Sequence, residues 1–392
     1  MQFDKIGKLA ERYLEIVDSA SNRENRRVWD NAGERYLLER WRGRSNRSEK
    51  APFTMAMDIS GYAQMLGIDC EAYYTQPDVN LHEQLRYAIW EYEHIDSDRY
   101  FENAVFSSFG SVFEASFFGS KIHYLKGSAP WYDERDAVFS DKKKLLNLKP
   151  FDFYTTGLCP RAISFYENAK DKLRGCGIEP MFPVNMRSPF STAIMLRGLT
   201  PLLMDFYDDP DFVHALMSAV TGYLKEFMTA RSRYLGKPID ECYLFNDEVA
   251  TPMLSPDLFE EFILPYEIEL SEHCGGVRYW HSCGVSQAFY SSVAKIPGLK
   301  MMHIGPWSDI EKAVEVFGPR QIPLEICVSS NRDMYEKTPD QMVKQLARIR
   351  EICEGKVRYS VRCDGIAVLH TKEETLKKMD DWCRAARRAL QS

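Results

Sequence analysis

Two residues in the C-terminal half of the chain have the chemistry and spacing to bind a metal ion together. His281 and Cys283 end the run V-R-Y-W-H-S-C-G at 277–284, whose β-branched and aromatic residues predict a strand. Side chains two positions apart on a strand share one face, so we expect the imidazole and the thiol to point the same way. Such a pair suits a soft or borderline metal, zinc above all.

The composition excludes several classes of protein. The chain has 392 residues, of which 45% are hydrophobic and 27% charged, as is typical of a soluble globular protein with a large core. A net charge of −7 provides no basic field for nucleic acid, and no apolar run approaches the roughly 20 residues of a membrane span. The N-terminus lacks a secretory signal, and the ten cysteines lack the spacing of a disulfide framework. We therefore expect a cytoplasmic protein that binds neither nucleic acid nor a membrane.

Strands and helices alternate along most of the chain. Strands are predicted near residues 52–58, 100–109, 181–186, 242–247, 277–283, 299–304, 322–328 and 357–363. Helices start at capping signals between them, such as the capping box T-P-D-Q at 338–341. About eight strands separated by helices predict an α/β fold, a closed (β/α)8 TIM barrel. The sequence contains no dinucleotide, P-loop or nucleophile-elbow fingerprint.

The first 50 residues are predicted to lie outside the barrel. Ile6, Leu9, Tyr13 and Val17 fall at helical spacing, and the basic stretch that follows carries mixed charges, which favours a solvated helix face and linker over a nucleic-acid arm. We expect an N-terminal helical extension over residues 1–50 and the barrel over residues 51–392.

Active sites of such barrels lie at the carboxyl ends of the strands, and polar residues gather at those positions. They are Asp58, Asn246, Asp247, Glu248, His281, Cys283, His303, Glu325, Cys327, Cys363 and Asp364. The neighbouring pair His273 and Cys274 ends a helix instead, so we expect it on the opposite face. Spacing leaves the third metal ligand open between Cys363 and Cys327, with Glu248 or Glu325 available for a fourth position.

These residues resemble a known family. H-S-C-G at 281–284, with Cys363 80 positions after Cys283, resembles the H-x-C…C zinc signature of the uroporphyrinogen-decarboxylase-like methyltransferases. These are (β/α)8 proteins that move methyl groups between corrinoids and thiols such as coenzyme M. Three further segments are similar to the family's: E-A-S-F-F-G-S-K-I-H-Y at 114–124, N-M-R-S-P-F-S-T-A at 185–193 and the acidic strand end with L-S-P-D-L-F-E-E-F-I-L-P-Y at 245–266.

The resemblance implies a ligand set, a chemistry and partners. His281, Cys283 and Cys363 would bind Zn²⁺. A methyl-corrinoid on a partner protein would exchange a methyl group with a small-molecule thiol or a tetrahydrofolate-type acceptor. Asp247 and Glu248 are the predicted catalytic residues, which would orient the thiol or a metal ligand. Substrate contacts are predicted for Asp58, Asn185, Arg187 and Glu325.

Two departures separate this chain from the decarboxylase itself. The segment before Asp58 lacks the arginine-rich pattern that a substrate with many carboxylates requires, and L-E-I-C at 324–327 replaces the family's usual strand end. A metal-free decarboxylase or lyase that uses Asp58, Asp247 and Arg187 is one alternative, and it would tolerate loss of Cys283. A non-enzymatic barrel with a structural zinc, which binds a corrinoid or a partner protein, is the other.

Overall fold

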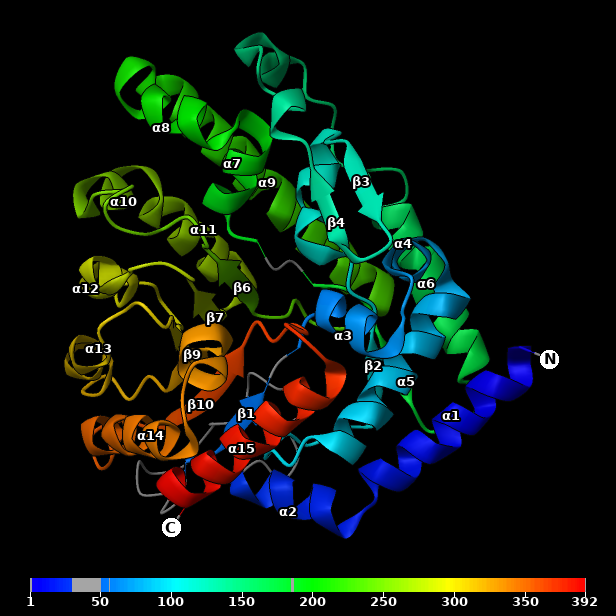
Figure 1. The fold of residues 1–392 in the computed structure, drawn as a ribbon. Helices are drawn as coiled ribbons and strands as arrows, with labels where there is room; N and C mark the ends of the chain where they lie inside the picture. Colours follow the sequence, from blue (N-terminus) through cyan, green and yellow to red (C-terminus); the bar gives the residue numbers. More distant parts are fainter. Residues whose placement is uncertain (1, 30–50, 56, 185–186, 392) are drawn as a thin grey trace.

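Six parallel strands form the main sheet of the protein (Figure 1). The computed structural model describes residues 2–29, 51–55, 57–184 and 187–391. In spatial order the strands are β1 (Phe53–Met55), β10 (Tyr359–Asp364), β9 (Leu324–Ser329), β8 (Met302–Ile304), β7 (Val277–His281) and β6 (Cys242–Phe245). Each lies close to a stretch that the sequence predicts as a strand.

Two further parallel strands belong to the barrel. β2 (Ala104–Phe106) pairs with β5 (Glu179–Met181). On one side of this pair, Arg187 forms a parallel bridge with Phe245 of β6. On the other side, the Asp98 backbone N–H donates to the Phe53 carbonyl of β1 at 3.0 Å, and the Phe53 N–H donates to Asp98 Oδ2 at 3.0 Å. The eight strands make the predicted (β/α)8 TIM barrel, although the described residues form no continuous ladder between β1 and β2.

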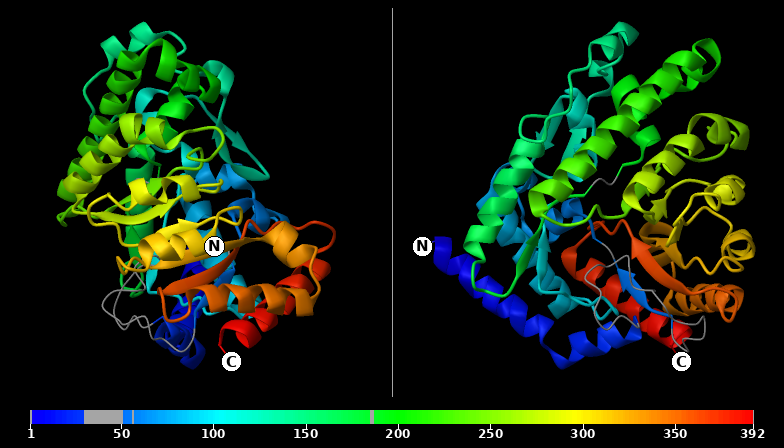
Figure 2. Two further views of the ribbon diagram at one scale, coloured as in Figure 1. Left: turned by 90° about the vertical axis from the view of Figure 1, so that its left-hand side faces the viewer. Right: turned by 180° about the vertical axis from the view of Figure 1, so that it is seen from behind.

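Helices follow the strands and pack outside them (Figures 1 and 2). They are α3 (Ile59–Leu66), α4 (Cys70–Thr75), α5 (Pro77–His94), α6 (Cys159–Lys172), α7 (Pro189–Arg197), α8 (Leu199–Asp208), α9 (Pro210–Leu235), α10 (Pro256–Phe262), α11 (Leu264–Cys274), α12 (Tyr290–Val293), α13 (Ile310–Phe317), α14 (Pro339–Cys353) and α15 (Lys372–Leu390). A hairpin of β3 (Ile122–Leu125) and β4 (Ser128–Tyr132) is inserted after β2. None of the described helices is long and apolar enough to cross a membrane.

Helix starts match the local signals in the sequence. Thr338 and Gln341 form the predicted capping box at α14, which satisfies two backbone N–H groups that the first turn leaves without partners. Asp209 caps α9 and Ser255 caps α10, each followed by a proline, a residue whose fixed φ suits the first helical position. Local side-chain chemistry therefore sets where these elements begin.

The N-terminal helices pack onto the barrel. α1 (Gln2–Val17) lies against α5, with Ile6 and Ala10 in one apolar cluster with Leu81 and Leu85. α2 (Ala20–Val28) follows, and both helices run along one edge of the molecule (Figures 1 and 2). The described part of the predicted extension is helical over residues 2–17 and 20–28. Residues 30–50 lie outside the described part, and the predicted boundary at residue 50 stays a prediction.

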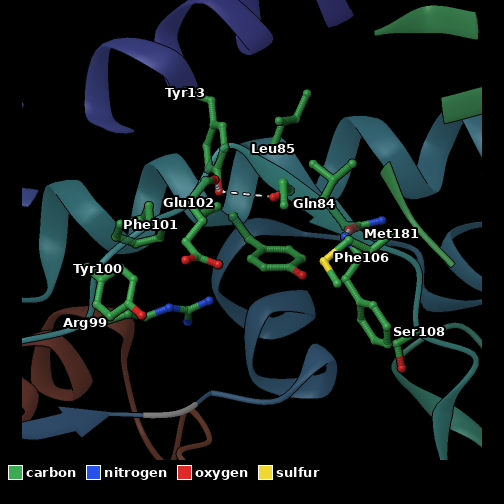
Figure 3. Close-up of a pocket in the computed structure, with 14 residues that line it drawn as sticks. Tyr13, Gln84, Leu85, Arg99, Tyr100, Phe101, Glu102, Phe106, Ser108 and Met181 are labelled. Carbon is green, nitrogen blue, oxygen red and sulfur yellow. Dashed lines mark hydrogen bonds between the residues drawn. The ribbon is translucent and has the colours of Figure 1, made fainter. Parts of the chain in front are cut away.

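A cavity of about 230 Å³ lies between α1, α5 and β2 (Figure 3). Its polar walls bond within the protein. The Tyr13 hydroxyl donates to the Glu102 carbonyl at 2.7 Å, and the Gln84 carboxamide oxygen accepts from the Phe106 N–H at 3.0 Å. No predicted site residue is among the residues that line it. The cavity is therefore a feature of the contact between the extension and the barrel.

Candidate metal centre

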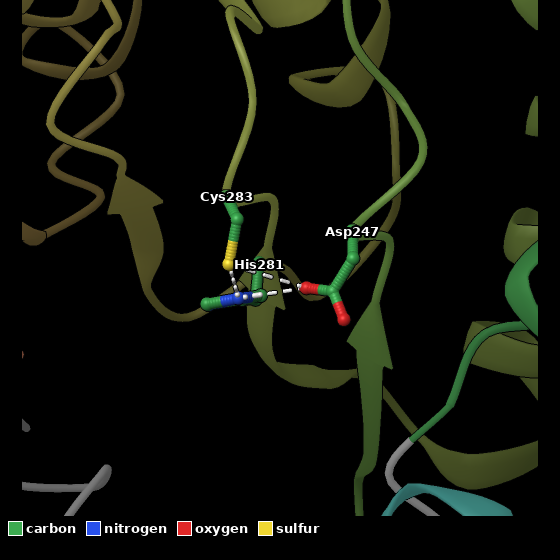
Figure 4. A group of neighbouring side chains, drawn as sticks. All are labelled: Asp247, His281 and Cys283. Atoms are coloured by element: carbon green, nitrogen blue, oxygen red, sulfur yellow. Dashed lines mark hydrogen bonds and ion pairs between the residues drawn. The ribbon is translucent and has the colours of Figure 1, made fainter. Parts of the chain in front are cut away.

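Three potential metal ligands meet where β6 and β7 end. His281 Nε2 lies 3.1 Å from Cys283 Sγ and 3.1 Å from Asp247 Oδ1, and Cys283 Sγ lies 3.4 Å from the same oxygen. Figure 4 shows the three side chains turned toward one another. Among the residues that the structure describes, this is the one group of three or more His, Cys, Asp or Glu side chains close enough to share a metal ion.

The triangle fits a tetrahedral zinc ion. At Zn–N, Zn–O and Zn–S bond lengths of about 2.0–2.3 Å, tetrahedral donor atoms lie about 3.3–3.6 Å apart. The observed separations of 3.1 Å, 3.1 Å and 3.4 Å are slightly shorter, so a small outward shift of each donor would suffice. An imidazole, a thiolate and a carboxylate form a donor set that zinc accepts.

Aromatic neighbours hold the imidazole of His281. His281 is buried, its ring stacks on Phe245 at a centroid distance of 4.7 Å, and the ring of His303 lies 4.0 Å away. Burial, His281 and Arg362 lower the pKa of His303 well below its ordinary value, so His303 is neutral, and its Nδ1–H donates to the Ser282 carbonyl at 2.9 Å. Stacking fixes the His281 ring, since its Nδ1 is buried and has no hydrogen-bond partner among the described residues.

Asp247 is held as a carboxylate. Burial acts to raise the pKa of Asp247, but the hydrogen bond with His281 and the charges of Arg187 and His281 outweigh burial and hold that pKa well below its usual range. Arg187 Nη1 lies 2.8 Å from Asp247 Oδ2, so one carboxylate oxygen faces the guanidinium and the other faces the triangle. Asp247 therefore has the charge and orientation of a metal ligand.

Glu248 lies beside Arg187 and Asp247 in a less polar setting. Burial raises its pKa above the ordinary value, against the opposing effects of Arg187 and of a hydrogen bond from Ser191. Arg187 Nη1 lies 3.6 Å from Glu248 Oε1, and the Ser191 hydroxyl donates to Glu248 Oε2. The structure thus brings together both predicted catalytic residues with Arg187, one of the predicted substrate contacts.

Cys283 is the only exposed one of the ten cysteines, all of which the structure describes. Partial burial of its sulfur and the negative charge of Asp247 raise the pKa of the Cys283 thiol well above its ordinary value. A thiol in this setting stays protonated unless a cation stabilises the thiolate, and a metal ion supplies that charge.

The comparisons with known proteins agree with this fold. The family model for uroporphyrinogen decarboxylase matches residues 89–385. The chain belongs to the uroporphyrinogen decarboxylase family. Among solved structures, a methyltransferase from Methanosarcina mazei has a TM-score of 0.59 at 17% sequence identity, over 86% of this chain and 94% of that chain; at this identity the likeness shows a shared fold. No curated protein gives a significant match to the chain.

Cys363 lies away from the metal group, although the resemblance to the uroporphyrinogen decarboxylase family implies that it is a ligand. It pairs in register with Met55 of β1, whose Sδ contacts Cys383 of α15 at 3.3 Å. Registered neighbours on adjacent strands face the same side, so Cys363 points outward and lies buried in the hydrophobic core. The structure brings Asp247, and not Cys363, to His281 and Cys283. The reason is strand alternation, because Arg362 and Asp364 occupy the inner face of β10.

Arg362 organises the inner face opposite the triangle. Its Nη2 lies 3.3 Å from Glu325 Oε2 and 3.1 Å from Asp364 Oδ2, and its Nε donates to Cys327 Sγ at 3.4 Å. Glu325 also accepts a hydrogen bond from the Tyr279 hydroxyl. The predicted substrate contact Glu325 therefore lies inside the barrel but is already bonded. Sequence reasoning missed Arg362, which strand alternation next to Cys363 would have indicated.

Two of the predicted substrate contacts, Asp58 and Asn185, are not joined to the metal group by any contact among the described residues. Asp58 is exposed and caps α3, where its Oδ1 accepts from the Gly61 N–H at 2.7 Å, and no described contact joins it to the metal group. Asp58 therefore serves as a helix cap, a common role for Asp at this position, and its predicted substrate contact stays a prediction. Asn185 lies outside the described residues, and its predicted contact stays a prediction.

The pair His273 and Cys274 lies away from the site, as expected. Both residues end α11. His273 Nε2 contacts Thr229 Oγ1 at 3.0 Å, and Cys274 is buried and hydrogen-bonds with Cys242. The amino ends of the strands carry packing residues there.

Proposed function

We propose that this chain is a zinc-dependent methyltransferase that moves a methyl group between a corrinoid carried by a partner protein and a thiol or tetrahydrofolate-type acceptor. The observation that supports zinc is the triangle of donor atoms on Asp247, His281 and Cys283. Three protein ligands with one open position are typical of catalytic zinc, whereas four protein ligands are typical of structural zinc.

Each residue of the site has a defined task in this proposal. Asp247, His281 and Cys283 would hold Zn²⁺, which when bound lowers the pKa of a substrate thiol and so favours the nucleophilic thiolate. Arg187 fixes Asp247 through the oxygen that faces away from the triangle. Glu248, which Ser191 and Arg187 hold in place, would accept a hydrogen bond from the substrate and orient it.

Family membership and fold support methyl transfer as the reaction. The structural neighbour from Methanosarcina mazei is a methyltransferase with the same fold, and the H-S-C-G half of the zinc signature coincides with two corners of the triangle. The corrinoid and its carrier protein enter the proposal through the family resemblance alone.

The alternatives have weaker support. A metal-free lyase would use Asp58 and Arg187 on its substrate, but Asp58 caps α3 and Arg187 is engaged with Asp247 and Glu248. A structural zinc would call for a fourth protein ligand, and the group of described residues has three members.

The test combines metal content with activity. We expect purified protein to contain about one zinc per chain and to demethylate methylcobalamin when a thiol is supplied. Cys283→Ser and Asp247→Asn should each weaken zinc binding by at least about tenfold and lose activity in parallel. Cys176→Ser, which changes a half-buried cysteine outside the site, is the matched control. Undiminished activity after removal of the metal would contradict the proposal.

A further inference from the structure

Arg362 is shared by two carboxylates on the inner face of the barrel. Its guanidinium lies 3.1 Å from Asp364 Oδ2 and 3.3 Å from Glu325 Oε2, and its remaining contacts include Cys327 Sγ. One positive charge therefore faces two negative charges. A guanidinium that is already paired with two carboxylates has little left for an anionic substrate group, because the anion would have to displace one of them.

Arg187, on the other side of the site, also faces two carboxylates. Arg187 lies 2.8 Å from Asp247 and 3.6 Å from Glu248. Counted together with the Arg362 group, four carboxylates face two guanidinium groups, a formal charge of −2. A bound Zn²⁺ would add two positive charges and a Cys283 thiolate one negative charge. The formal charge of these groups would then be −1, so the site would stay negative with its metal bound.

The Arg362 group acts on the position that a substrate would occupy. The ring of Tyr279 stacks beside that of His281 at a centroid distance of 6.0 Å. The Tyr279 hydroxyl donates to Glu325, which pairs with Arg362, so the Arg362 group borders the triangle. The side chain of Asp364 is 42% exposed, whereas that of Glu325 is 9% exposed. Asp364 is therefore the carboxylate of this group that an incoming molecule can meet.

We propose that the thiol taken by this site has a neutral or positively charged tail, and that Asp364 selects against thiols with an anionic tail. This inference rests on the proposed function, since it assigns the class of the small-molecule substrate. An ammonium tail beside Asp364 would gain electrostatic energy, and a sulfonate or carboxylate tail would be repelled by the net negative set.

Three thiols with one carbon skeleton test the inference. Cysteamine, 2-mercaptoethanol and 2-mercaptoethanesulfonate share a two-carbon chain and differ in the charge of the tail. Their binding to the zinc-loaded protein is measured by titration calorimetry at constant ionic strength. We expect cysteamine to bind about tenfold more tightly than the sulfonate, with 2-mercaptoethanol between them, and the difference to shrink in about 0.5 M salt. Equal affinities, or tighter binding of the sulfonate, would overturn the inference and leave the proposed function standing.

Binding of none of the three thiols would instead contradict the open metal position, and so the proposed function itself. Asp364→Asn identifies the selecting residue, because it removes one charge at nearly constant volume. We expect the ratio of the cysteamine and sulfonate affinities to fall toward one in this variant. Glu351→Gln, which removes an exposed charge on the outside of α14, should keep the wild-type ratio. An unchanged ratio in Asp364→Asn, or loss of its zinc, would exclude Asp364 as the selecting residue.

Discussion

Arg362 and Cys363 are neighbours on β10 with opposite surroundings. Arg362 reaches Glu325 across the inside of the barrel, whereas Cys363 is fully buried in the core outside it. A thiol on the outer face cannot share a metal ion with His281 unless the strand shifts by one residue, which would turn every side chain of β10 to the other face. Such a shift would bury the guanidinium of Arg362 among apolar side chains.

The role of Cys363 is open to a direct check. We expect Cys363→Ala to keep about one zinc per chain and to lower the free energy of unfolding by about 1–2 kcal/mol, because it removes a buried sulfur from a packed core. Metal analysis and urea denaturation measure the two effects. Loss of zinc from Cys363→Ala, with zinc retained in Cys176→Ser, would restore the ligand set that the family signature implies.

A buried carboxyl group joins three elements behind the site. Glu267 of α11 accepts hydrogen bonds from Trp280 Nε1 of β7 at 3.0 Å and from Asn246 Nδ2, directly after β6, at 2.6 Å. Burial raises the pKa of Glu267 to about 7, against these two hydrogen bonds, which favour the charged form. The contact fixes the ends of β6 and β7 relative to α11, and those strand ends position Asp247 and His281.

This raised pKa makes the stability of the packed elements depend on pH. The folded state favours the protonated carboxyl group, so its contribution is complete below the unfolded pKa of about 4.3 and is lost as the pH rises through about 7. Between pH 4.5 and pH 7.5 we expect the free energy of unfolding to fall by about 3 kcal/mol more in the wild type than in Glu267→Gln. Urea denaturation at both pH values measures this difference, and identical changes in the two proteins would contradict it.

At the scale of the whole molecule, the N-terminal extension contributes to the interior of the barrel. Trp29 is 2% exposed and packs in one cluster with Tyr100, Tyr243, Tyr279 and Met301, and its Nε1–H donates to the Asp98 carbonyl at 2.6 Å. Asp98 in turn bonds to β1. The extension therefore supports the junction between β1 and β2, where the described residues form no continuous ladder.

Trp29→Ala tests that support. We expect it to lower the free energy of unfolding by about 3–5 kcal/mol, the usual cost of removing a buried aromatic side chain, measured by urea denaturation. Tyr154→Ala, at an exposed aromatic position, should change stability by less than about 0.5 kcal/mol. Equal stabilities of the two variants would contradict a structural role for the extension.

The sequence by itself determined the barrel, the helix starts and the pairing of His281 with Cys283. These follow from contacts within a few residues: the alternation of strand and helix signals, caps such as Thr338, and the two-residue spacing of His281 and Cys283 at the end of β7. The same local logic separated His273 and Cys274 from the site.

Only the tertiary structure decided the third corner of the metal group. Asp247 and Cys363 both end predicted strands. In the structure Asp247 lies in the turn after β6, and the direction of the Cys363 side chain depends on the register of β10 with its neighbours. Register is fixed by packing between residues far apart in the chain, such as Cys363 with Met55, which spacing does not encode. The capping role of Asp58 and the shared charges around Arg362 were likewise decided by contacts in three dimensions, because charge pairs form wherever the fold brings their partners together.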